Sequence, residues 1–221
     1  MRFGVDEAGK GPVFGSMWAA AVVVPDRSVL PDGVDDSKRL APARREELAA
    51  RIRDDDRIRV GVAEIPPARI DDPETDMNSL TVAAHAEALA DVGHDGAGGT
   101  GTEALPGIVD AGDTDEARFG RRVAEATGFE VDVTAEHGAD ETYPVVAAAS
   151  IVAKVERDAQ LARLADDFGD VGSGYPSDPT TRAFLADYVA ETGDLPPFAR
   201  TTWSTCADVL AANEQSALGD F

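Results

Sequence analysis

The sequence has one cysteine, very few lysines and no long hydrophobic run, and each shortage excludes a class of protein. Cys206 alone cannot form a disulfide framework or a thiolate metal site. No apolar run approaches the roughly 20 residues that cross a bilayer. Asp6 and Glu7 interrupt the apolar N-terminal run too early for a signal peptide. We therefore expect a cytoplasmic protein without a membrane partner.

The shortage of lysine accompanies a strong excess of acidic residues. Lys10, Lys38 and Lys154 are the only lysines, and 42 acidic residues face 20 basic ones, for a net charge of −22. The acid is spread along the whole chain, so we interpret it as a solvated surface adapted to high salt, as in a halophile, and not as a mimic of nucleic acid. At about 1 M salt the Debye length is about 3 Å, so long-range repulsion of nucleic acid would be screened.

Apolar periodicity predicts an α/β fold. We expect strands at 1–5, 17–24, 57–65, 105–109 and 130–135, and helices at 42–53, 76–92, 114–126, 144–168 and from Asp178 to about Thr192, with a short last helix after a core Trp203. We expect one domain over 1–221, with a C-terminal helical part from about residue 170. The Gly-rich stretch 93–102 predicts a flexible loop insertion.

The N-terminal strand ends in two carboxylates followed by Gly-Lys-Gly. Adjacent residues on a strand face opposite ways, so Asp6 and Glu7 share one site only if the chain bends there. Gly9 and Gly11 permit such a bend. Clustered carboxylates repel one another unless a cation lies between them, and oxygen-only ligands suit Mg²⁺ or Mn²⁺.

Two other interpretations of this stretch stay open. An acidic turn closing a hairpin would use Gly and Asp for local backbone reasons. A phosphate loop of the form G-x-x-x-x-G-K would use Gly4, Gly9 and Lys10, but its next residue should be Ser or Thr. Here Gly11 and Pro12 follow, which favours the metal interpretation.

Two later acids also stand at strand ends. Asp110 ends the strand 105–109, where sites in α/β sheets are usually built. Asp113 competes for that role, but its spacing to Glu116 resembles a capping box, so we assign Asp113 to the helix cap. Asp140 follows the strand 130–135 and, from its position alone, could simply cap the next helix. We expect His85 to be a surface or half-buried helix residue and not a ligand.

The stretch from Asp6 to Pro12 resembles the signature of ribonuclease HII, whose usual form has Arg in place of Lys10. The segment from Ala147 to Asp158 resembles the second signature of that family, and Trp203 after Arg200 is similar to its archaeal form. The resemblance covers nearly the whole chain. It implies a ribonuclease H-like mixed five-stranded sheet flanked by helices, with helical C-terminal additions.

The resemblance also implies a site. Asp6, Glu7, Asp110 and Asp140 match the four metal-binding acids of the family, which hold two Mn²⁺ or Mg²⁺ ions. The implied substrate contacts are Gly9, Lys10, Gly11, Ser37, Lys38, Asn78, Ser150, Lys154 and Tyr175. Gly138 departs from the family, which often has a basic residue there.

The implied reaction is hydrolysis of the RNA strand of RNA–DNA hybrids and incision 5′ of ribonucleotides embedded in DNA. The products would carry 3′-hydroxyl and 5′-phosphate ends, and we expect the enzyme to be a monomer. Two other classes of function stay open, a phosphate-loop nucleotidase and an inert nucleic-acid- or cation-binding module.

Overall fold

The computed structural model describes residues 1–34, 40–93 and 104–219, and the side chains as far as residue 215. Two compact units share the chain. The first unit contains residues 1–8, 18–64 and 76–156, and the second contains 9–17, 65–75 and 157–221. The prediction of a single catalytic domain stays a prediction. Ser37, Lys38 and all of the predicted Gly-rich loop except Gly93 lie outside the described residues.

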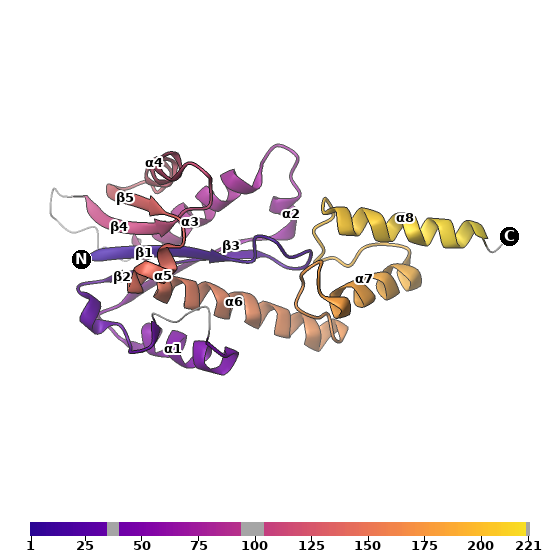
Figure 1. Ribbon diagram of the computed structural model, residues 1–221, viewed down its shortest axis with the longest axis horizontal. Helices are drawn as coiled ribbons and strands as arrows, with labels where there is room; N and C mark the ends of the chain where they lie inside the picture. The colour runs from indigo at the N-terminus through magenta and orange to yellow at the C-terminus, as the bar shows by residue number, and fades with distance from the viewer. Residues whose placement is uncertain (35–39, 94–103, 220–221) are drawn as a thin grey trace. The chain divides into compact units, whose positions relative to one another are not determined.

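The first unit is built on a mixed five-stranded sheet, as predicted (Figure 1). Its strands are β1 (Arg2–Ala8), β2 (Met17–Val24), β3 (Arg59–Ile65), β4 (Leu105–Asp110) and β5 (Val131–Glu136), in the order β3-β2-β1-β4-β5. β1 pairs antiparallel with β2 and parallel with β4, and β4 pairs parallel with β5. β1 and β2 are buried over most of their length, and β2 is accordingly a continuous apolar run.

Helices cover both faces of this sheet. They are α1 (Pro42–Asp54), α3 (Met77–Gly93), α4 (Glu116–Ala126), the short α5 (Ala139–Thr142) and the first half of α6 (Pro144–Phe168). Figure 1 shows α1 and α6 on one side of the sheet and α3 and α4 on the other. Leu48 and Ile52 of α1 and Val146 and Val152 of α6 are fully buried in one core with Val22 of β2.

Two helix starts show how local chemistry sets the boundaries. Pro42 occupies the first turn of α1, where its missing N–H leaves no hydrogen bond unmade. The predicted capping box of α4 is wrong. Asp115 is the N-cap and accepts a hydrogen bond from the backbone N–H of Arg118, while Asp113 lies before the cap.

The second unit contains the helices α2 (Pro67–Ile70), α7 (Pro179–Thr192) and α8 (Ser204–Gly219) and the second half of α6. Phe14 lies at the centre of its core, edge-on to Phe184 and Phe198 at centroid distances of 5.7 and 5.2 Å. Trp203 is half-buried against this core, and α8 is longer than the short helix predicted. No helix within the described residues is long and apolar enough to cross a membrane.

Gly4 is required by the close approach of α6 to β1. A methyl group at Gly4 would lie 2.5 Å from the carbonyl carbon of Val145 and 2.6 Å from the amide nitrogen of Val146. We predict that Gly4→Ala lowers the free energy of unfolding by about 3 kcal/mol, because backbone on both sides must move apart. Chemical denaturation in molar salt measures this change.

Gly120 in α4 offers a matched control, since a methyl group there would meet β5 at 3.3 Å or more. Gly120→Ala gains helix propensity of up to about 1 kcal/mol, which offsets the tight contact. Equal stability losses in the two variants would contradict this account of the packing of β1 on α6.

Candidate functional site

Asp6 and Asp110 meet because their strands are parallel neighbours. Val5 is the partner of Val109 in the register of β1 and β4, so the next residue of each strand places a carboxylate at the same end of the sheet. Adjacent strands lie about 4.8 Å apart. Asp6 is 6% exposed and Asp110 is half-buried.

Asp140 is brought to the same end of the sheet by the turn after β5. Asp110 is the partner of Glu136 in the register of β4 and β5. Gly138 then adopts a left-handed conformation (φ 64°) and starts α5, and the backbone N–H of Ala139 donates to Oδ1 of Asp110 at 2.7 Å. Asp140 follows within the first turn of α5 and is buried.

The electrostatics show that these carboxylates act on one another. Burial raises the pKa of Asp6 well above its ordinary value, and the nearby charges of Glu7, Asp110 and Asp140 raise it further. A hydrogen bond from Ser150 acts in the opposite direction. Burial also raises the pKa of Asp110, with Glu7 and Asp140 adding to the effect and the Ala139 hydrogen bond opposing it. Such crowding of like charges favours a cation in their midst.

Glu7 points to the opposite face of the sheet from Asp6. β1 continues as a strand through both residues, and the chain turns at Gly9 (φ 92°), one of the two glycines expected to permit a bend. His85 of α3 lies on that opposite face, and its Nε2 is 2.7 Å from Oε2 of Glu7.

The expectation that His85 is a surface or half-buried residue is also wrong. The ring is fully buried, edge-on to Phe119 at 5.2 Å. Its Nδ1 has no hydrogen-bond partner within the described residues. His85 therefore orients Glu7 through one ring nitrogen, a role that the sequence did not signal because α3 meets β1 only in the folded chain.

The donor set suits a hard divalent cation, because it consists of carboxylate oxygens. In the described part of the chain, however, no three His, Cys, Asp or Glu side chains lie close enough together to hold a metal ion as they stand. The carboxylates repel one another, and Asp6, Glu7 and Asp110 are each hydrogen-bonded by a separate protein group. Side-chain rotation is thus needed before several of them share an ion.

Asp113 does not join the other acids. Its two carboxylate oxygens accept hydrogen bonds from the Arg118 guanidinium at 2.6 and 2.8 Å, and this partner holds the pKa of Asp113 below its ordinary value. A carboxylate with its own arginine has no need of a cation. This pairing separates Asp113 from Asp110, although only two residues lie between them in the sequence.

Ser150 and Lys154 lie one turn apart on α6, as their spacing predicts. Nζ of Lys154 donates to Oγ of Ser150 at 2.8 Å, and Ser150 hydrogen-bonds Asp6. Ser150 is fully buried and Lys154 is half-buried. The two residues thus connect α6 directly to the carboxylate cluster, and their contact with a substrate phosphate stays a prediction.

The Gly9-Lys10-Gly11 loop and Tyr175 lie together within the second unit. A methyl group at Gly11 would be 3.6 Å from Cε1 of the Tyr175 ring. Tyr175 is 39% exposed, and the Arg157 guanidinium lies 4.9 Å from its ring centroid. An exposed aromatic ring beside glycine backbone is a surface on which a sugar or base can stack.

Arg200 is a functional candidate to which the sequence analysis assigned no role of its own. Its guanidinium is fully buried and donates to the carbonyl oxygens of Gly9, Lys10 and Gly15. The sequence gives no local sign of this contact, because about 190 residues separate Arg200 from the loop.

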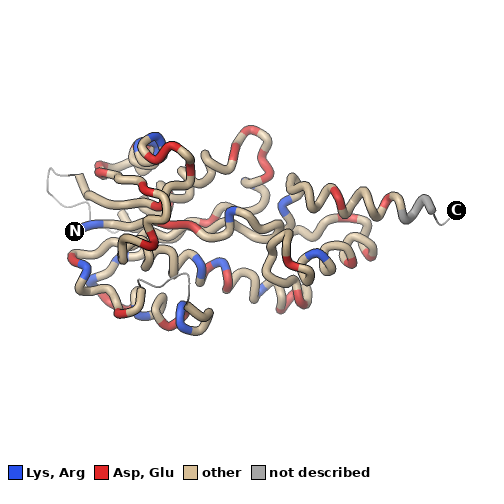
Figure 2. Tube along the Cα trace, in the orientation of Figure 1, with Lys and Arg blue, Asp and Glu red and all other residues tan. Residues whose placement is uncertain are grey.

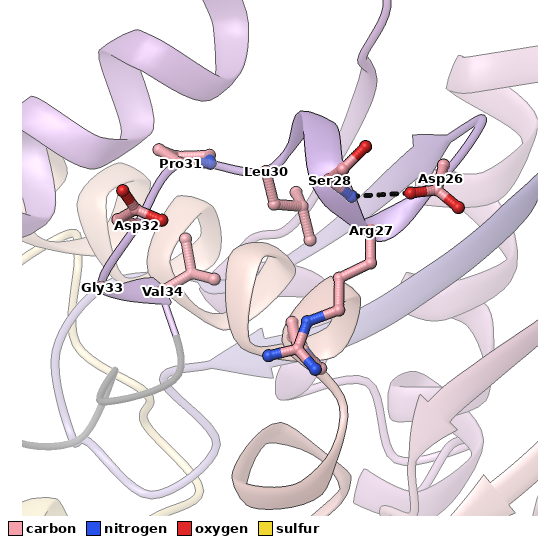
Figure 3. Close-up of a pocket in the computed structure, with 9 residues that line it drawn as sticks. Asp26, Arg27, Ser28, Leu30, Pro31, Asp32, Gly33 and Val34 are labelled. Carbon is pink, nitrogen blue, oxygen red and sulfur yellow. Dashed lines mark hydrogen bonds between the residues drawn. The ribbon is translucent and has the colours of Figure 1, made fainter.

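Other predicted residues and surfaces lie apart from these groups. Asn78 is exposed in the first turn of α3, where its backbone N–H donates to Oδ1 of Asp76. A surface hollow lined by residues 26–28 and 30–34 and by Pro144 includes none of the predicted site residues (Figure 3). Figure 2 shows Asp and Glu distributed over helices and loops of both units, as expected of a solvated acidic surface.

Comparison with known proteins places these observations in a family. The family model described as Ribonuclease HII matches residues 3–206. A ribonuclease HII from Haloarcula marismortui is 63% identical over the full length of both chains. Among solved structures, the ribonuclease H2 of Pyrococcus horikoshii has a TM-score of 0.85 and 36% identity, covering 97% of this chain and 99% of that one. A PCNA:RNase HII complex from Archaeoglobus fulgidus has a TM-score of 0.81 and 40% identity, covering 95% and 96%.

The repulsion at the carboxylate cluster leads to a prediction about stability. We expect Asp6→Asn to raise the melting temperature of the protein in chelator and molar salt, because the amide removes a buried charge among like charges; the gain in the free energy of unfolding is on the order of 1 kcal/mol. Asp113→Asn should lower the melting temperature instead, since it weakens an ion pair with Arg118. Calorimetry on the wild type, Asp6→Asn and Asp113→Asn measures these melting temperatures. A loss of stability in Asp6→Asn would show that the repulsion is unimportant.

A second prediction concerns His85. His85→Leu should weaken Mn²⁺ binding about 10-fold or more, the usual effect of losing a group that orients a ligand. His85→Gln keeps an N–H donor and should stay much closer to the wild type. Electron paramagnetic resonance of free Mn²⁺ measures both affinities without nucleic acid, and unchanged binding in the folded leucine variant would exclude the orienting role.

Proposed function

Because this chain belongs to the ribonuclease HII family and is a ribonuclease H, a nucleic-acid hydrolase, we propose that it cuts the RNA strand of RNA–DNA hybrids and incises 5′ of ribonucleotides within duplex DNA. The reaction would use two divalent ions, Mn²⁺ or Mg²⁺, and leave 3′-hydroxyl and 5′-phosphate ends. Asp6, Glu7, Asp110 and Asp140 would hold the ions.

The observation that supports this proposal best is the register that sets Asp6 beside Asp110, with Asp140 delivered by the α5 turn. Two ions bound there would supply an activated water and stabilise the leaving oxygen. The chain itself would hold the carboxylates in place: Ser150 and the Ala139 N–H bond Asp6 and Asp110, and His85 orients Glu7.

Substrate recognition would use the loop and the tyrosine of the second unit. The 2′-hydroxyl distinguishes RNA from DNA at a given nucleotide, and backbone groups can sense it at close range because glycine has no side chain. Tyr175, exposed beside Gly11, would stack on the sugar. Ser37, Lys38, Asn78, Ser150 and Lys154 would contact the phosphate backbone.

The working environment would be concentrated salt in the cytoplasm. The relatives from Haloarcula marismortui and Halobacterium salinarum come from halophilic archaea, and the net charge of −22 agrees with such an origin. The chain itself would act as a monomer. Because the Archaeoglobus protein forms a complex with PCNA, PCNA is a candidate partner here too.

We predict that the protein cuts a duplex holding one ribonucleotide, and an RNA–DNA hybrid, in Mn²⁺ and multimolar salt. Asp110→Asn should lower the rate by at least about 10³-fold, because a metal-binding carboxylate is lost. Asp113→Asn is the matched control, since it changes an acid near the same strand end that is paired with Arg118. Gel analysis of end-labelled strands gives the rate and the chemistry of the ends.

The same variants and substrates distinguish the proposed reaction from the other two classes of function. A phosphate-loop nucleotidase would turn over nucleotide in the Asp110→Asn variant, and an inert module would bind the hybrid without cutting it. Uncut substrates with folded wild-type protein would contradict the proposed reaction.

A further inference from the structure

We propose that Arg200 is a positioning residue that holds the Gly9-Lys10-Gly11 loop in its substrate-binding conformation; this inference rests on the proposed function. Arg200 is the largest fully buried side chain among the described residues. Its Nη2 donates to the carbonyl oxygen of Gly9 at 2.6 Å, its Nη1 to that of Lys10 at 2.9 Å, and its Nε to that of Gly15 at 2.9 Å. One planar fork thus fixes both ends of the turn that follows β1.

The bonds to Gly9 and Lys10 determine where the loop amides point. In a trans peptide the C=O and the next N–H point in opposite directions. Because the carbonyls of Gly9 and Lys10 turn inward to Arg200, the N–H groups of Lys10 and Gly11 turn away from it. Successive N–H groups on one side of a loop form a concave site for anions and oxygen acceptors, which is what a phosphate or a 2′-hydroxyl requires.

The side chain of Arg200 is itself held firmly. The indole ring of Trp203 lies 5.1 Å from its guanidinium carbon, and Trp203 Nε1 reaches the carbonyl oxygen of Gly11. Asp71 accepts hydrogen bonds from Thr201 and Thr202, directly after Arg200 in the chain. The backbone N–H of Arg200 donates to the carbonyl oxygen of Val13 at 2.8 Å. All of these groups belong to the second unit.

Burial also gives this cation a property that surface lysines lack. Charges exposed to molar salt are screened, whereas buried charges are screened much less. Burial and the nearby charge of Arg157 lower the pKa of Arg200 to about 10, so it stays charged at neutral pH. In a chain with three lysines, a buried arginine beneath the loop supplies positive potential that salt leaves largely intact.

The test compares Arg200→Lys and Arg200→Met with the wild type on a duplex holding one ribonucleotide. Lysine keeps the charge but cannot reproduce the planar fork. Its donors all sit on one nitrogen atom, whereas Arg200 uses three separate nitrogens to reach three carbonyl oxygens. We expect kcat to fall about 10²-fold in the lysine variant, since a displaced loop misplaces the reacting phosphate, while KM changes by less than about threefold. The methionine variant should lose at least as much.

Val189→Ala is the control for general damage to the second unit, because Val189 of α7 is fully buried in the core of that unit. It should lower the melting temperature by a comparable amount yet keep the wild-type kcat. Hydrogen exchange should rise at residues 9–11 in both Arg200 variants and stay unchanged there in Val189→Ala.

The outcomes keep the two proposals apart. A wild type that cuts neither substrate defeats the proposed function, whereas hydrogen exchange still reports whether Arg200 holds the loop. Wild-type kcat in folded Arg200→Lys and Arg200→Met, or unchanged exchange at residues 9–11, overturns the positioning role. A loss of activity that only follows the unfolded fraction, as in Val189→Ala, overturns it as well.

Discussion

The structure depends on keeping several like charges together at one end of a sheet. Two carboxylates 4 Å apart repel by about 4 kcal/mol at an effective dielectric constant of 20, and Asp6 is buried beside Asp110. Strand order imposes this arrangement, because the parallel register of β1 and β4 puts Asp6 and Asp110 at the same end of two adjacent strands. Hydrogen bonds from Ser150 and the Ala139 N–H hold the acids against this repulsion, and a bound cation would turn the repulsion into attraction.

The sequence predicted the sheet and most of the helices, because apolar periodicity is a local property that folding rarely overrides in long segments. It also placed Asp110 at the end of its strand. It could not show that His85 lies buried against Glu7, because that contact depends on how α3 packs on β1. It assigned Asp113 to the helix cap, whereas α4 starts later than predicted, after the cap Asp115, and leaves Asp113 paired with Arg118 five residues on. The sequence also could not show that Arg200 binds the Gly9-Lys10-Gly11 loop, since this contact joins residues about 190 positions apart.

The net charge of −22 disfavours binding of the proposed substrate, because a nucleic acid is also negatively charged. Molar salt removes most of that long-range repulsion, but it also removes most of what Lys and Arg gain by releasing counterions from phosphates. Recognition must then use contacts of short range. The glycine backbone beside Tyr175, held from below by Arg200, and ions bound by the carboxylates would provide contacts of that kind.

The central claim is that the four scattered acids form one cage for divalent ions. Anomalous X-ray scattering from crystals grown with Mn²⁺ and a duplex substrate tests it most directly. The account predicts two manganese peaks about 4 Å apart, bound by Asp6, Glu7, Asp110 and Asp140. Manganese found only on other surface acids, or any of the four carboxylates turned away from both ions, would contradict it.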